Sequence, residues 1–182
     1  LFDFFSYMNN PTTILNDIFG YSSFRLDQEE IINSILANKN VLAILPTGGG
    51  KSICYQIPAL MAEGLSIVIS PLIALMKDQV DSLNKKSEVA AFINSSLEFR
   101  EIEKIFNQIY SGTIKLLYLA PERLENNLFV ERLSKINLEY LFIDEAHCIS
   151  EWGHNFRPSY TKIKDFKNYL TFKNIAAFTA TA

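Results

Sequence analysis

Six short runs of apolar and β-branched residues recur along this chain, and they constrain its fold more than any other feature. Each run is continuous and does not alternate with polar residues, which is typical of strands that are buried on both faces. Such strands occur in parallel sheets that helices cover on both sides. The runs are residues 41–45, 66–70, 90–93, 115–119, 140–144 and 175–179.

Segments with a helical spacing of apolar residues lie between these runs. In residues 27–37, for example, Ile31, Ile32, Ile35 and Leu36 fall on one face of a helix. The same spacing predicts helices at residues 52–61, 72–83 and 98–110. Because strands and helices alternate, we expect right-handed β-α-β crossovers and an α/β fold with helices on both faces of a parallel sheet.

Length and composition indicate one globular domain. The 182 residues are 48% hydrophobic and 20% charged, which suffices for a sizeable core. We expect this domain at residues 12–182, preceded by an extension at residues 1–11. We expect no membrane span, because no apolar run approaches about 18 residues. We also expect no signal peptide, because the start lacks a basic leader and a small-residue cleavage site.

The cysteines and the net charge bear on compartment and partners. Cys54 and Cys148 lie far apart and form no Cys-x-x-Cys pair, so we expect two buried apolar side chains in a reducing, intracellular compartment, cytoplasmic or nuclear. The net charge of −3 argues against a wholly basic nucleic-acid surface. It is compatible with a local DNA-binding track, because only the charge that faces the phosphates matters.

A glycine-rich loop follows the first apolar run, and residues 45–52 read Leu-Pro-Thr-Gly-Gly-Gly-Lys-Ser. The glycines allow the backbone to turn its N–H groups toward an anion, and a helix that begins near Ser52 directs its positive end to the same place. Lys51 would reach the β and γ phosphates of a nucleotide, and the Ser52 hydroxyl would be a Mg²⁺ ligand. The residues expected to bind phosphate are Thr47, Gly48, Gly49, Gly50, Lys51 and Ser52.

This loop departs from the general P-loop pattern at one place, because Leu45 stands where the pattern has a glycine. A glycine-rich turn with a chance Lys-Ser pair is therefore the alternative interpretation. The predicted strand before the loop and the predicted helix after it favour the phosphate loop.

Two carboxylates, Asp144 and Glu145, end the fifth apolar run. In a parallel sheet this end and the phosphate loop lie at the same carboxyl edge, where ligands bind. We expect Asp144 to hold Mg²⁺ and Glu145 to deprotonate the water that attacks the γ-phosphate. A solvated strand end followed by a helix cap is the alternative. His147 has no second metal ligand at suitable spacing, so we expect it to hydrogen-bond to residues 179–181 and to relay the nucleotide state.

Several motifs together resemble those of known helicases. They are the phosphate loop at residues 47–52, Asp-Glu-Ala-His at 144–147, Thr-Ala-Thr at 179–181, and the stretches at 19–28, 53–59 and 148–158. The first three resemble superfamily 2 helicases, and the other three narrow the resemblance to the RecQ family. The resemblance implies a three-layer P-loop (RecA-like) fold and a 3′-to-5′ ATP-dependent DNA helicase that acts in DNA recombination and repair.

The resemblance also assigns a base-binding segment. In the family, the stretch that contains Gln28 holds adenine, and the amide of this residue can both donate to and accept from the base. Tyr21 or Arg25 would stack on the base or hold it. Phe19, Tyr21 and Phe24 are core aromatic residues in the alternative interpretation, which for Phe19 and Phe24 stays open.

For DNA, the family's aromatic-rich loop matches the stretch around Trp152 and Phe156, whose rings would stack on unpaired bases, while Arg157 would hold a phosphate. The strand-to-helix junctions at residues 70–79 and 119–124 match two further DNA-contacting motifs. Ordinary strand-to-helix connections are the alternative interpretation of both. The implied partners are single-stranded and partly duplex DNA, and the implied cofactors are ATP and Mg²⁺.

Members of the family continue beyond the last motif into a second motor lobe, a zinc-binding module and usually a winged helix. We therefore expect a fragment that binds nucleotide, hydrolyses it slowly and does not unwind DNA, because both lobes must close around ATP. A non-catalytic binding module is one alternative, which the intact Lys51, Ser52, Asp144 and Glu145 disfavour. An RNA-directed relative is the other, which the aromatic-rich loop disfavours.

Overall fold

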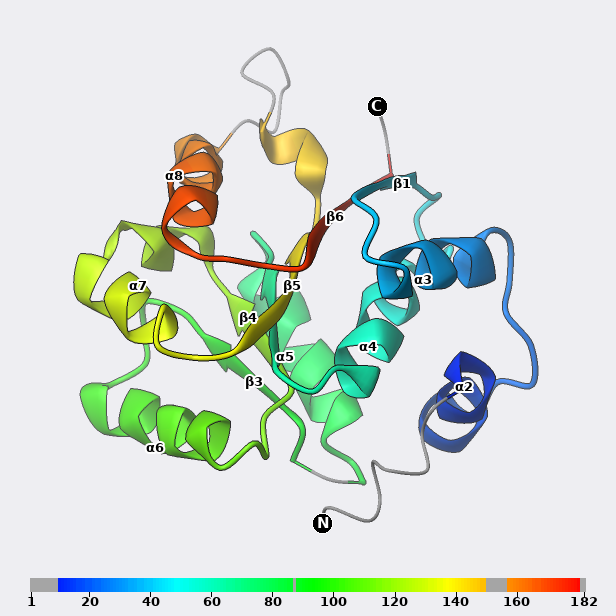
Figure 1. Cartoon of the computed structure of the whole chain (residues 1–182), viewed down its shortest axis with the longest axis horizontal. Helices are drawn as coiled ribbons and strands as arrows, with labels where there is room; N and C mark the ends of the chain where they lie inside the picture. The colour runs from blue at the N-terminus through cyan, green and yellow to red at the C-terminus, as the bar shows by residue number, and fades with distance from the viewer. Residues whose placement is uncertain (1–9, 87, 150–156, 181–182) are drawn as a thin grey trace.

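A parallel sheet is the framework of the protein. The computed structural model describes residues 10–86, 88–149 and 157–180, and Figure 1 shows their arrangement. Within these residues, one six-stranded sheet has the order β1-β6-β5-β2-β4-β3. Its strands are β1 (Val41–Ile44), β2 (Leu65–Ile69), β3 (Ala90–Ile93), β4 (Leu116–Leu119), β5 (Leu138–Ile143) and β6 (Asn174–Thr179). All neighbouring strands run parallel, so every predicted apolar run forms a strand of the predicted kind of sheet.

The strand order brings distant parts of the chain together at one edge. β6 lies between β1 and β5, with Ile44 opposite Thr179 and Ile143 opposite Ala177. The carboxyl ends of these three strands are therefore neighbours. The loop after β1, the turn after β5 and the end of β6 consequently meet at one place.

Helices cover both faces of the sheet (Figure 1). One layer contains α2 (Pro11–Phe19), α3 (Gln28–Leu36), α4 (Lys51–Met61) and α5 (Ile73–Leu83), and the other contains α6 (Phe99–Tyr110), α7 (Asn127–Leu133) and α8 (Lys162–Tyr169). Short 3₁₀ segments are η1 (Pro121–Glu125), η2 (Ala146–Ile149) and η3 (Pro158–Thr161). This arrangement confirms the predicted three-layer α/β fold. In this part of the chain, no helix is long and apolar enough to cross a membrane.

Two hydrophobic cores fill the spaces between the sheet and its helix layers. The first centres on Tyr55 of α4, whose ring centroid lies 5.4 Å from that of Phe178 and 5.6 Å from that of Phe142. The second joins the sheet to α6 and α8 through Phe106 and Phe166, among other residues. Burial of such large apolar side chains supplies most of the stabilising free energy of a domain.

Both cysteines are core residues, as the sequence predicted. Cys54 is buried in the first core and Cys148 in the second, and neither forms a disulfide. Burial raises the pKa of the Cys54 thiol to about 12 and also raises that of Cys148. Both thiols therefore stay protonated and pack as small apolar side chains.

The predicted and observed helices differ mainly at the chain start and in two short helices. α2 begins at Pro11, and the Asn10 side chain caps it by accepting from Thr12 N at 2.8 Å. The predicted extension of residues 1–11 therefore overlaps the start of a helix; its residues 1–9 lie outside the described part. The helices α2, α7 and α8 were not predicted. The last two have only 7 and 8 residues, too few for a clear apolar period.

Candidate nucleotide-binding site

The phosphate loop connects β1 to α4, as predicted. Gly48 and Gly50 have φ angles of 77° and 74°, a conformation that glycine adopts without strain. Gly50 caps α4, which begins at Lys51, one residue earlier than predicted. The Gly49 amide donates to Pro46 O at 2.9 Å and closes the turn. The loop thus presents its backbone at the positive end of a helix, the arrangement that binds anions.

Leu45, which departs from the P-loop pattern, is a core residue. Its side chain is buried in the first core, and its backbone amide donates to Thr179 O at 3.0 Å. A glycine here would leave a space in the core where the leucine now packs. The leucine that replaces the pattern's glycine therefore fills the core beneath the loop, and the glycine-rich residues 48–50 are unaffected.

Gln28 binds the phosphate loop directly. Its Nε2 donates to the carbonyls of Gly49 and Gly50 at 3.3 and 3.2 Å, and its Oε1 accepts from Arg25 N at 2.9 Å. The residue is only 2% exposed. Both ends of the amide are thus engaged within the protein, so a contact with adenine requires this amide to exchange partners. The base contact of Gln28 stays a prediction, and its role in holding the loop is a finding that the sequence did not show.

The neighbouring residues of the predicted adenine segment divide into two groups. Tyr21 is 44% exposed, and the Arg25 guanidinium lies 5.4 Å from the centroid of its ring. The two side chains thus form a cation–π pair, and their contact with a base stays a prediction. Phe19 and Phe24 are partly buried and pack against the first core, which favours the core interpretation for these two residues.

Asp144 is a buried carboxylate at the end of β5, with 5% exposure. Its Oδ2 accepts from Ser70 Oγ at 3.3 Å, and its Oδ1 accepts from Glu145 N at 3.0 Å. Burial, followed by the negative charge of Glu145, raises the pKa of Asp144 to about 6. The sequence placed Ser70 in a DNA-contacting motif and did not predict this bond. The adjacency of β2 and β5 explains it, because both strands end at the same edge.

The acidic pair and the phosphate loop meet through Lys51. Its Nζ lies 3.8 Å from Glu145 Oε1, so the loop lysine and the predicted general base form an ion pair. Glu145 has a φ of 49°, a left-handed conformation that costs a non-glycine residue roughly 1–3 kcal/mol. The turn that aims this carboxylate at the loop is therefore held by other contacts.

His147 connects Glu145 to the end of β6. Its Nδ1 lies 3.2 Å from Glu145 Oε2 and 3.0 Å from Thr179 Oγ1. The contact with Thr179 confirms the predicted partner of this histidine. No cluster of three or more acidic, histidine or cysteine side chains that could hold a metal occurs in the described residues. His147 is thus placed to transmit a change at Glu145 to the last strand.

The predicted DNA-contacting residues are only partly described. Trp152 and Phe156 lie outside the described residues. Arg157 donates from a guanidinium nitrogen to Pro71 O at 3.2 Å, which joins its segment to the junction before α5. The predicted helix start at residues 119–124 is wrong in type, because Pro121–Glu125 forms the short 3₁₀ segment η1.

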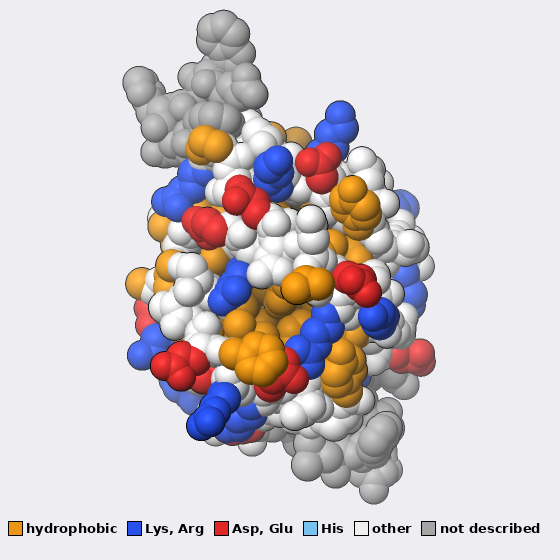
Figure 2. Space-filling model, turned by 90° about the vertical axis from the view of Figure 1, so that its left-hand side faces the viewer, with side chains coloured by type: hydrophobic (Ala, Val, Ile, Leu, Met, Phe, Trp, Pro, Cys, Tyr) orange, Lys and Arg blue, Asp and Glu red, His pale blue; other side chains and the backbone are white. Residues whose placement is uncertain are grey.

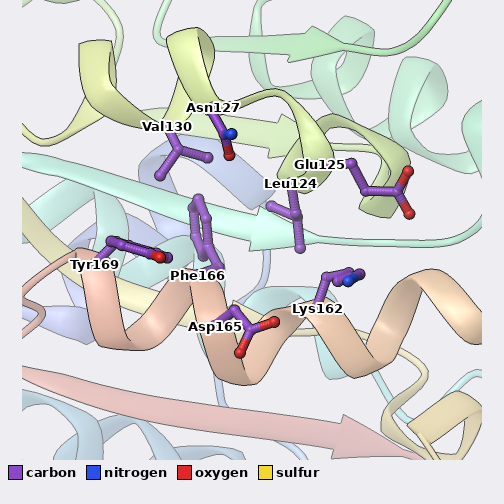
Figure 3. Close-up of a pocket in the computed structure, with 8 residues that line it drawn as sticks. All are labelled: Leu124, Glu125, Asn127, Val130, Lys162, Asp165, Phe166 and Tyr169. Atoms are coloured by element: carbon purple, nitrogen blue, oxygen red, sulfur yellow. The ribbon is translucent and has the colours of Figure 1, made fainter.

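A separate hollow lies on the outer face of the second helix layer. Figure 2 shows this face, with an apolar depression among side chains of both charges. The hollow has a volume of about 350 Å³, and Figure 3 shows its lining from η1, α7 and α8. It includes no residue of the phosphate loop or the acidic pair, so it is not the nucleotide site. Its lining residues are Leu124, Glu125, Asn127, Val130, Lys162, Asp165, Phe166 and Tyr169.

Together these contacts define a P-loop nucleotide-binding lobe of the helicase class, with an Asp-Glu pair facing the loop lysine. The sequence profile of the DEAD/DEAH box helicases matches residues 25–182. The chain belongs to the DEAD/DEAH box helicase family, and it matches the N-terminal motor lobe of RecQ helicases.

The curated relatives are much longer than this chain. The ATP-dependent DNA helicase RecQ of Pasteurella multocida (strain Pm70) is 50% identical over 169 residues, which are 93% of this chain and 27% of that protein. The RecQ of Bacillus subtilis (strain 168) is 50% identical over 177 residues, which are 96% of this chain and 30% of that protein. The chain thus spans less than a third of the length of these relatives.

Solved helicase structures share the fold. A hypothetical ATP-dependent RNA helicase from Sulfolobus tokodaii superimposes with a TM-score of 0.73 at 23% identity, over 95% of this chain and 51% of that one. The Mycobacterium smegmatis helicase Lhr, bound to ssDNA and AMP-PNP, gives 0.69 at 16% identity, over 90% of this chain and 24% of that one. At these identities the likeness shows the fold alone.

Proposed function

We propose that this lobe binds ATP with Mg²⁺, and that the complete protein is a 3′-to-5′ ATP-dependent DNA helicase that acts in recombination and repair. The observation that carries the proposal is the meeting of Lys51 and Glu145 at the carboxyl edge of the sheet, 3.8 Å apart. Local motifs place these two residues on separate segments, and the fold joins them. The names of the RecQ relatives support the assignment to DNA helicases.

Each residue at this edge has a definite task in the proposed reaction. The backbone N–H groups of the phosphate loop and the start of α4 bind the phosphates, and Lys51 neutralises the β and γ phosphates. When Lys51 turns to a phosphate, its ion pair with Glu145 opens. The Glu145 carboxylate then accepts the proton of the water that attacks the γ-phosphate. The contacts of His147 with Glu145 and with Thr179 connect this proton transfer to the end of β6.

The oxygen donors of the site suit Mg²⁺. This ion prefers oxygen ligands and keeps several of its waters, and the buried Asp144 carboxylate and the Ser52 hydroxyl are such donors. When bound, the ion would neutralise charge on the phosphates. Asp144 is a carboxylate at neutral pH, because its raised pKa of about 6 still lies below 7.

The proposed partners are single-stranded DNA, partly duplex DNA and a second motor lobe. The hydrogen bond from Arg157 to Pro71 O joins two segments that the family resemblance assigned to DNA contact, residues 148–158 and 70–79. Trp152 and Phe156, which lie outside the described residues, are proposed to stack on unpaired bases. The 182 residues alone are proposed to bind nucleotide but not to unwind DNA, since unwinding requires a second lobe that closes on ATP.

Calorimetric titration of the folded 182-residue chain tests the nucleotide site. Mg-ATP is expected to bind in clear preference to Mg-GTP. Tyr21→Ala is expected to reduce this preference, because the exposed ring and Arg25 form the surface proposed for the base. Tyr169→Ala, which removes an exposed tyrosine on α8, serves as the matched control. Equal affinity for both nucleotides in the unchanged chain would contradict the assignment of the adenine segment.

Strand separation by the complete protein tests the helicase assignment. A duplex with a 3′ single-stranded tail is expected to be unwound in the presence of ATP, and a duplex with only a 5′ tail is not. Unlabelled single-stranded DNA is expected to inhibit this reaction at lower concentration than RNA of the same sequence. Equal inhibition by DNA and RNA would favour the RNA-directed alternative.

A further inference from the structure

Tyr160 ties the backbone of the acidic pair to a segment outside the sheet. It lies in η3 and is 1% exposed. Its hydroxyl donates to the main-chain carbonyl of Asp144 at 2.9 Å. None of the motifs in the sequence includes this tyrosine, and none of the steps derived above uses it.

The bond falls on the peptide group that sets the direction of Glu145. This peptide links Asp144 to Glu145, whose φ of 49° is left-handed. Its N–H donates to the Asp144 carboxylate at 3.0 Å, and its carbonyl accepts from Tyr160. The peptide before it is also held, because Asp144 N donates to Ile69 O at 2.9 Å. This is the last backbone bond between the β5 segment and β2. The hydroxyl of Tyr160 thus holds this peptide from a segment outside the sheet, whereas the other bonds come from β2 and from Asp144 itself.

The segment that carries Tyr160 is itself anchored. Tyr160 N donates to Arg157 O at 2.9 Å, and Arg157 N donates to Cys148 O at 3.1 Å. The Arg157 guanidinium also donates to Pro71 O. Burial raises the pKa of the Tyr160 phenol far above its usual range, so the hydroxyl keeps the proton that it donates.

We propose that Tyr160 is a positioning residue for ATP hydrolysis, which holds the Asp144–Glu145 peptide so that the Glu145 carboxylate points to the phosphate loop. This inference rests on the proposed function, since it assigns Tyr160 to the same reaction. The left-handed turn at Glu145 is strained, and a donor on the preceding carbonyl opposes its relaxation. Without that donor, the carboxylate would spend more time away from the position in which it meets the attacking water.

Tyr160→Phe in the complete protein tests this role, because it removes the hydroxyl and keeps the ring. With saturating single-stranded DNA, kcat for ATP hydrolysis is expected to fall about 10-fold, within the range that small misplacements cause. KM for ATP and the Kd for nucleotide are expected to change less than 2-fold, because Lys51 and the loop are untouched. Tyr140→Phe is the matched control, since it removes a hydroxyl from a buried tyrosine of β5, the strand that leads to Asp144, and should leave kcat unchanged.

A double variant separates positioning from general support of the fold. In the Glu145→Gln background, Tyr160→Phe is expected to have no further effect on turnover, because it acts through Glu145. An unchanged kcat for Tyr160→Phe overturns the proposal. So does a parallel loss of kcat and nucleotide affinity, since the hydroxyl would then support the fold and not the position of Glu145. If the unchanged protein hydrolyses no ATP, the proposed function itself fails, which is a different result.

Discussion

Lys51→Ala is expected to lower the affinity of the lobe for Mg-ATP by about 10- to 150-fold, as isothermal titration calorimetry would measure. A hydrogen bond to a charged group contributes roughly 1.5–3 kcal/mol, which corresponds to this change in Kd. The lysine side chain is largely shielded from water, with 14% exposure, so water replaces its charge poorly. The backbone amides of the phosphate loop remain and account for residual binding.

The control for this experiment is Lys135→Ala. Lys135 is exposed and pairs with Glu131 on the surface, so its loss should leave nucleotide affinity unchanged. Lys51→Ala also leaves Glu145 without its ion-pair partner, and thermal unfolding of both variants would detect any loss of fold. A folded Lys51→Ala lobe with unchanged affinity would refute the assignment of the phosphate loop.

Glu145→Gln is expected to lower DNA-stimulated ATP hydrolysis by the complete protein about 10²- to 10⁴-fold, the usual contribution of a general base. Glutamine keeps the size of the side chain but does not accept the proton of the attacking water. Nucleotide affinity should change little, because Lys51 and the loop amides are retained. Steady-state phosphate release and nucleotide titration on the same sample would measure the two effects separately.

Glu131→Gln is the matched control for this second change. It removes the same charge from an exposed residue of α7, so turnover should stay at the level of the unchanged protein. Turnover by Glu145→Gln within a few fold of that level would exclude Glu145 as the base. The proton would then have to pass to another group at the edge of the sheet.

The sheet could be predicted from sequence because most of its strands are buried on both faces. The edge strand β1 is the exception, since Leu42 and Ile44 are exposed. A continuous apolar run such as residues 90–93 avoids water only as a strand covered on both sides. The predicted and observed bounds of β3 agree. The helices α3, α4, α5 and α6 were predicted from the helical spacing of their apolar residues. α8 was not, because Ile163 and Phe166 are its only buried residues, and two positions do not define a helical period.

The site could be predicted where the chemistry is local. Lys51 follows a glycine-rich loop, and Asp144 ends a buried run, so a short motif suffices for each. The bonds from Gln28 to Gly49 and Gly50, and from Tyr160 to Asp144, could not be predicted in this way. They depend on how α3 and η3 dock against the sheet, and docking is set by packing of the whole domain.

The position of β6 between β1 and β5 has a consequence for how the protein is made. The phosphate loop emerges early during synthesis, the acidic pair much later, and the strand that joins them last. Until β6 inserts, β1 has no described strand partner, and Lys51 has no fixed relation to Glu145. Before β6 has been made, a growing chain therefore has no complete nucleotide site, so ATP cannot stabilise those early intermediates through that site. The earlier elements must avoid aggregation by their own packing, and the nucleotide can act only on a lobe whose last strand is already in place.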